Sequence, residues 1–245
     1  SSLSSETTLS IHVADSGWGW GITNPDINMD GFCDFYVTTG HVTRESSVDY
    51  DNRFWTRDLF LGNSDHNSTL NSFFRSEARE VVQRRESYGG YFANRFFLNV
   101  EGKKAIEIAW LLGLHLPNDC RNVTWTDIDN DGDQDLIVLS MNVWPEKSQL
   151  LHIFKNLSNE AENKRIHWVG FDINCVSGNP IPYGLGVTIE SEKMKVLRYI
   201  SSWESYRVQP ESIIRLALPD NTKKIKISFT TPQLKKFTFE NLKLN

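Results

Sequence analysis

The sequence predicts a mainly β protein. Two acidic stretches share one spacing, and each is followed by a short apolar run that is typical of a buried strand. Aromatic residues make up 12% of the 245 residues and include eight Trp and fourteen Phe, a composition that suits sheets. A chain of this length can form one large domain or two ordinary ones with a substantial core.

The most acidic stretch, DIDNDGDQDLIV, spans residues 127–138 and has a carboxylate at every second position. Five such anions repel one another unless a cation neutralises them, and an oxygen-rich loop with Gly at position 6 is typical of calcium binding. An EF-hand opens in the same way but needs Glu at position 12, where this chain has Val138 in an apolar run. The sequence therefore predicts a strand–loop–strand calcium site. Its expected ligands are the side chains of Asp127, Asp129, Asp131 and Asp135 and the main-chain carbonyl of Asp133.

The same pattern occurs earlier in the chain, in NPDINMDGFCDFYV. Gly31 again stands at position 6, and Val37 stands at position 12 in an apolar run. Two loops that agree in spacing and in the following strand favour two structural Ca²⁺ sites over two chance acidic turns. The expected ligands of this first site are the side chains of Asp26, Asn28, Asp30 and Asp34 and the main-chain carbonyl of Phe32.

Further strands are expected on both sides of each loop. An incoming strand is predicted in DSGWGWGI before the first loop and in RNVTWT before the second. After the first loop, NRFFLNVEGKKAIEIAWLLGL predicts two strands around a turn at Gly102, and after the second, QLLHIFKNLS predicts one. A repeated unit of strand, calcium loop, strand and outer strands indicates a β-propeller blade.

These stretches resemble integrin-type FG-GAP (VCBS) calcium repeats. The later stretch HWVGFDINCVSGNPIPYGLGVTIES resembles the start of the ASPIC/UnbV domain that follows such repeats. A later motif of that domain is altered here to IRLALPD, and another is missing after IKISF. The resemblance implies calcium-bound propeller blades followed by a small β-domain. The positions that carry it in the β-domain are Gly184, Gly186, Val187, Ser205, Tyr206 and Gln209.

The expected organisation follows from these matches. Residues 1–160 would form the propeller blades, with a long insert at about 42–92, and residues 166–245 the ASPIC/UnbV-like β-domain. Residues 1–15 would be the last strand of an earlier blade or an arm. Within the insert, NSFFRSEAREVVQRRES predicts an amphipathic helix packed against the blades.

The expected partner is a protein. A propeller closes with four to eight blades, and only two can be counted, so open edges and apolar faces remain. We therefore expect another protein chain, or the missing part of the same precursor, to complete the propeller. A net charge of −5 does not favour nucleic acid, and no apolar run approaches the roughly 20 residues of a membrane span.

The sequence leaves two functions open. The first is a calcium-stabilised recognition module in an extracellular or periplasmic location, where calcium reaches the roughly 10⁻⁴ to 10⁻³ M at which such modules bind it. The N-terminal SSLSSETTLS is no signal peptide, so this location implies a mature chain. The second is a calcium-bound propeller enzyme of secondary metabolism, for example one that alkylates aromatic rings, which the resemblance admits.

The site of such an enzyme would lie near residues 41–58 of the insert. A His or Asp there could act as a general base, and an Arg could hold a leaving anion. The three cysteines, Cys33, Cys120 and Cys175, form no CxxC pair, and their disulfide state stays open. The candidate catalytic side chains are His41, Asp49, Tyr50, Arg53 and Arg57.

Overall fold

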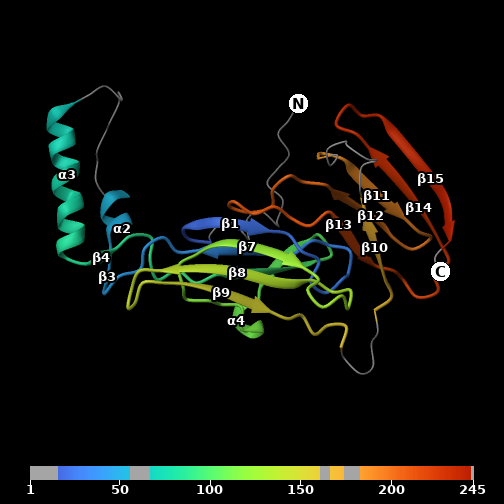
Figure 1. The fold of residues 1–245 in the computed structure, drawn as a ribbon, viewed down its shortest axis with the longest axis horizontal. Helices are drawn as coiled ribbons and strands as arrows, with labels where there is room; N and C mark the ends of the chain where they lie inside the picture. The colour runs from blue at the N-terminus through green and yellow to red at the C-terminus, as the bar shows by residue number, and fades with distance from the viewer. Residues whose placement is uncertain (1–15, 56–66, 161–165, 174–182, 244–245) are drawn as a thin grey trace.

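The computed structural model describes residues 16–55, 67–160, 166–173 and 183–243 (Figure 1). The prediction of a mainly β fold is confirmed, and the strands of these ranges form five sheets. Four of the sheets are antiparallel, and the fifth is a short parallel pair. Residues 1–15, which were predicted to be an arm or a strand of an earlier blade, lie outside the described ranges.

The N-terminal sheet has the strand order β1-β2-β5-β6. The first acidic loop joins β1 to β2, and the predicted turn at Gly102, with a φ of 69°, joins β5 to β6. The strands are β1 (Gly19–Thr23), β2 (Phe35–Thr39), β5 (Arg95–Val100) and β6 (Lys104–Glu107).

The second strand predicted after the turn exists as β6, but it ends at Glu107, and the AWLLGL stretch forms α4 (Ala109–Leu112) instead of extending the strand. The side chain of Glu107 accepts the N–H of Ala109 at the start of this helix. Gly113 ends it after one turn by adopting a left-handed conformation with a φ of 70°. This local bond and the glycine explain why the apolar run turns instead of extending.

The middle sheet has the order β7-β8-β9, and the second acidic loop joins its first two strands. Its strands are β7 (Cys120–Thr126), β8 (Asp135–Asn142) and β9 (Ser148–Phe154). One face packs on the N-terminal sheet through a shared apolar core. That core contains Tyr36 and Phe96 from the N-terminal sheet and Val123, Trp125, Leu136 and Val138 from the middle sheet.

The C-terminal β-domain, as we call residues 166–243, has a separate core. Strand β10 (Trp168–Asp172) pairs with β13 (Ile213–Ala217), and a four-stranded sheet has the order β12-β11-β14-β15. Apolar side chains such as Val187, Ile189 and Leu216 meet between these sheets. The strands of the larger sheet are β11 (Gly186–Glu190), β12 (Lys195–Tyr199), β14 (Lys224–Thr230) and β15 (Lys236–Lys243).

The insert forms the parallel pair β3 (Ser46–Asp49) and β4 (Glu86–Ser87) and the helices α2 (Tyr50–Trp55) and α3 (Ser68–Gln83). The predicted helix therefore exists, but it stands beside β4 at the end of the molecule and away from both sheets (Figure 1). Its apolar stripe is short, since Ala78 and Val82 are exposed. Among the described residues, none of the helices has the length and apolar character needed to cross a bilayer.

Candidate metal centres

The second acidic loop brings together three of its predicted ligands. Carboxylate oxygens of Asp127, Asp129 and Asp135 lie within 4.8 Å of one another. The two oxygens of Asp127 accept the N–H groups of Asp131 and Gly132, each at 3.1 Å. Gly132 has a φ of 100°, a conformation that few other residues adopt. These bonds curl the backbone so that alternate side chains point inward.

Asp131 and Asp133, the other two carboxylates of this loop, each have one oxygen without a hydrogen-bond partner among the described residues. Oδ2 of Asp131 and Oδ1 of Asp133 are buried and accept no hydrogen bond among the described residues. The other oxygen of Asp133 accepts the N–H of Asn159 at 3.0 Å. Burial raises the pKa of Asp133 to about 7, and the charge of Asp131 adds to the rise. Unpaired buried carboxylate oxygens are costly, so the loop fits a hard cation such as Ca²⁺.

Protein cations neutralise only part of the charge of this loop. Lys155 Nζ lies 2.6 Å from Asp129 Oδ2, and Arg215 Nε lies 3.0 Å from Asp127 Oδ2. Glu160 adds a further carboxylate, because its oxygen lies within 4.8 Å of oxygens of Asp129 and Asp131. Among the described residues, two positive charges therefore face six carboxylates. Lys155, Glu160 and Arg215 could not be predicted from the sequence, because they follow the loop without a recognisable spacing.

The first acidic loop has the same hydrogen-bond pattern. The two oxygens of Asp26 accept the N–H groups of Asp30 at 2.9 Å and Gly31 at 3.0 Å. Asp34 accepts the N–H groups of Ile27 and Asn99 at 3.0 and 2.8 Å. In the second loop, Asp135 accepts two backbone N–H groups in the corresponding way, from Ile128 and Asn156 at 2.9 and 2.8 Å.

The two loops differ in how far their side chains converge. In the first loop, Asn28 Nδ2 donates to Asp30 Oδ2 at 2.9 Å, so the amide occupies a carboxylate oxygen. Within the described part of the chain, the carboxylate oxygens of Asp26, Asp30 and Asp34 do not all lie within 4.8 Å of one another, as three of them do in the second loop. Phe32, the predicted carbonyl ligand, has an exposed side chain. Burial raises the pKa of Asp26 to about 6 and that of Asp34 to about 7.

The insert residues that were considered for catalysis have structural contacts. The carboxylate of Asp49 accepts N–H groups from Asp51, Gly89 and Gly90 at 2.8–3.0 Å, which fixes the base of the insert. His41 stacks on Trp20 at 5.2 Å between ring centroids. Tyr50 packs its ring against that of Tyr88. The side chain of Arg53 and all of Arg57 lie outside the described residues.

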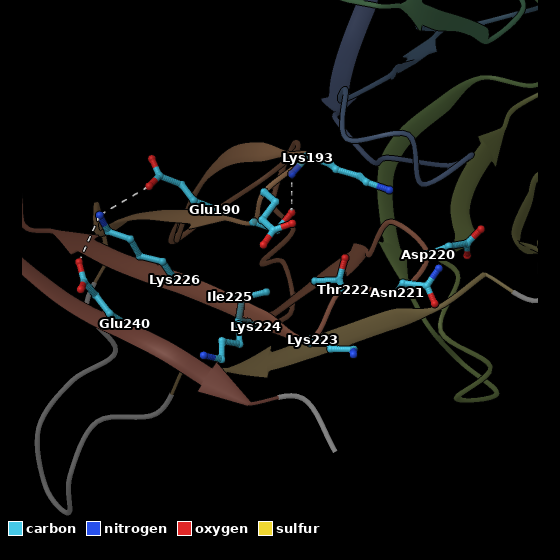
Figure 2. Close-up of a pocket in the computed structure, with 12 residues that line it drawn as sticks. Glu190, Lys193, Asp220, Asn221, Thr222, Lys223, Lys224, Ile225, Lys226 and Glu240 are labelled. Carbon is cyan, nitrogen blue, oxygen red and sulfur yellow. Dashed lines mark hydrogen bonds and ion pairs between the residues drawn. The ribbon is translucent and has the colours of Figure 1, made fainter.

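Two of the cysteines and a cavity on the C-terminal β-domain lie within the part of the chain that the structure describes. Cys33 is half-buried and Cys120 is buried, both as free thiols, and Cys175 lies outside the described residues. A cavity of about 850 Å³ lies on the C-terminal β-domain (Figure 2). Four lysines and four carboxylates line it, and Lys226 pairs with Glu190 and Glu240 at 3.8 and 3.5 Å. Its charges therefore balance within the protein.

The chain matches no protein-family model and no curated protein. The two acidic loops and the surfaces around them are therefore the features that bear on its function.

Proposed function

We propose that this chain is a calcium-stabilised, extracytoplasmic β-propeller module of the FG-GAP/VCBS type, with an ASPIC/UnbV-like β-domain, and that it recognises another protein. One observation carries the proposal: the second loop gathers several carboxylates and leaves buried oxygens without partners. A chain folds this way at low cost only when a cation offsets the charge.

Calcium would act here by fixing the loops. In the second loop it would be held by Asp127, Asp129, Asp131, Asp133 and Asp135. In the first it would be held by Asp26, Asn28, Asp30, Phe32 and Asp34. The ion supplies positive charge, and the residues supply the turn that joins β1 to β2 and β7 to β8. The N-terminal and middle sheets are then two adjacent blades whose first strands, β1 and β7, are neighbours.

The recognition surface would be the outer face of the middle sheet, defined by Ile137, Leu139, Leu151 and Ile153. Because side chains alternate along a strand, these residues point away from the core that Leu136 and Val138 enter. Ile137 lies opposite Ile153, and Leu139 lies opposite Leu151. Leu151 and Ile153 are 62% and 58% exposed. An apolar face of this kind fits another β-blade, from a second chain or from the missing part of the same precursor.

The Asp131→Ala variant is expected to lose most of the calcium-dependent rise in melting temperature. At ten times its dissociation constant, one calcium ion adds about 1.4 kcal/mol, which corresponds to roughly 2–4 °C for a chain of this size. Differential scanning calorimetry in calcium and in chelator measures the shift. Asp220→Ala, which removes an exposed carboxylate far along the sequence, serves as the control. Equal shifts in both variants would contradict a calcium site in this loop.

The Leu151→Lys variant is expected to weaken association through the outer face. In calcium, the wild-type chain should self-associate at least about tenfold more tightly than this variant, since a lysine placed in an apolar contact raises the free energy of association by about 1.4 kcal/mol or more. Sedimentation equilibrium over a concentration series measures this difference. Leu111→Lys makes the same change on α4, where Leu111 is also exposed. If both variants associated like the wild type, the outer face would not be the contact.

A further inference from the structure

The C-terminal β-domain is attached to the other sheets through polar contacts. The apolar cores on the two sides share no residue. A cavity of about 310 Å³ lies between them, lined by Asp26, Cys33, Arg198, Glu204 and Arg215 among others. The hydrogen bonds across this boundary include those that join Thr23 and Thr124 to Glu204, Asn122 to Tyr206, and Thr126 to Glu211. Charge and hydrogen bonding therefore contribute to this attachment, beside the ring contact of Tyr206 with Trp20 at 5.4 Å between centroids.

Two arginines of the C-terminal β-domain reach the same position in both acidic loops. Arg198 Nη2 lies 2.9 Å from Oδ2 of Asp26, which is position 1 of the first loop. Arg215 Nε lies 3.0 Å from Oδ2 of Asp127, which is position 1 of the second. The side chain of Arg215 is 6% exposed, and that of Asp127 is fully buried. Removing one partner of a buried ion pair of this kind is strongly destabilising, because the other charge is left buried and unpaired.

The same domain also contacts the glycine at position 6 of each loop. At Gly31, a Cβ atom would lie 3.5 Å from the side chain of Val196. At Gly132, it would lie only 2.0 Å from Nε1 of Trp168, so the indole occupies the space that the glycine leaves open. Each loop therefore presents two equivalent positions to the C-terminal β-domain, one charged and one close-packed.

The position-1 carboxylates have room for a cation beside the arginine. A carboxylate offers about four acceptor positions. In Asp127, Oδ2 receives the N–H of Gly132 and faces Arg215, whereas Oδ1 receives one N–H, from Asp131. A cation bound inside the loop and the arginine outside it would therefore stabilise the same loop conformation.

From these contacts we propose that cation binding in the two acidic loops holds the C-terminal β-domain in place through Arg198 and Arg215. The inference rests on the calcium binding of the proposed function. Without the cation, repulsion among the carboxylates favours an opened loop. In that conformation the carboxylate at position 1 no longer contacts the arginine, and the glycine at position 6 no longer packs against Val196 or Trp168. Because coupling between two binding events is reciprocal, loss of the arginine should also weaken calcium binding.

A thiol at position 205 can report whether the domain is attached. Ser205 is 3% exposed, and a Cβ atom built on Gly21 of β1 would lie 2.2 Å from its Oγ. Its burial therefore depends on contact between the domain and β1, at a site that is not part of either loop. Cys120, buried in the shared core of the N-terminal and middle sheets, reports unfolding of those sheets in the same molecule.

The experiment measures the rate of maleimide labelling of the Ser205→Cys variant, cysteine by cysteine, by peptide mass spectrometry. Removal of calcium should speed labelling at position 205 by about tenfold, within the usual range of coupling between sites, while Cys120 stays protected. Adding Arg215→Gln, or Arg198→Gln if the first fails to fold, should raise labelling in calcium and reduce the response to chelator. Arg207→Gln, which changes an exposed arginine nearby, should leave both unchanged.

The outcomes separate this inference from the proposed function. If calcium raises the melting temperature but labelling at position 205 does not respond, the loops bind calcium without holding the domain, and the inference is overturned alone. If position 205 and Cys120 become reactive together, the chain unfolds as a whole, which also overturns it. If calcium changes neither melting nor labelling, the calcium-binding module and the inference both fail.

Discussion

The Trp125→Ala variant is expected to lower the free energy of unfolding by about 3–5 kcal/mol, the range for truncating a large buried aromatic side chain. Trp125 lies in the core shared by the N-terminal and middle sheets. The centroid of its ring lies 6.4 Å from that of Tyr36 and 6.2 Å from that of Phe96, both in the N-terminal sheet. Removing it would leave a cavity between the sheets. Urea unfolding followed by circular dichroism gives the difference.

Trp110→Ala provides the matched control. It removes the same side chain from α4, where Trp110 is 76% exposed, so it should change the unfolding free energy by no more than about 0.5 kcal/mol. A similar loss in both variants would mean that the shared core does not hold the two sheets together. That result would contradict their description as packed neighbours.

The metal-free protein is expected to lose stability as the pH rises from about 4 to about 7. Burial raises the pKa of Asp34 and Asp133 to about 7 and that of Asp26 to about 6, from an ordinary value of 3.8. The folded chain therefore binds more protons than the unfolded chain across this interval. Between its unfolded and its folded pKa, each such group is protonated only in the folded state. Over that interval it lowers the free energy of unfolding by roughly 1.4 kcal/mol for each unit that the pH rises.

The stabilisation is complete below the unfolded pKa and is lost as the pH passes the folded values of about 6 and about 7. Burial also raises the pKa of Glu204 and of Glu211, which act in the same direction. Calcium needs deprotonated carboxylates, so saturating calcium should remove most of the decline. Urea unfolding of metal-depleted protein at several pH values checks the slope, and Asp133→Asn should reduce it. A metal-free stability that rose steadily over this interval would refute the assignment.

Much of each loop could be predicted because its signal is local. The spacing from Asp127 to Asp135, the glycine between them and the following apolar run all lie within twelve residues. Hydrogen bonds within the loop then follow from the same short segment, as those of Asp127 to Asp131 and Gly132 show. The strands that follow the loops, β2 and β8, begin at or one residue before the apolar runs.

The partners of the loops could not be predicted because they are far away in the sequence. Arg198 lies 172 positions from Asp26, and it belongs to a strand whose own pattern says nothing about a loop. Trp168 shows no motif that places it over Gly132. The position of α3 was missed for a related reason, since periodicity predicts a helix but not the surface on which it rests.

Glu204 has a consequence for the geometry of the two neighbouring sheets. Its carboxylate accepts hydrogen bonds from Thr23 of β1 and from Thr124 of β7, so a single side chain spans the first strands of two neighbouring sheets. The angle between adjacent sheets determines how many of them fit around a closed ring. In the proposed propeller, the C-terminal β-domain would therefore act as a spacer between these two sheets, and the length of one glutamate side chain would contribute to the curvature of the ring.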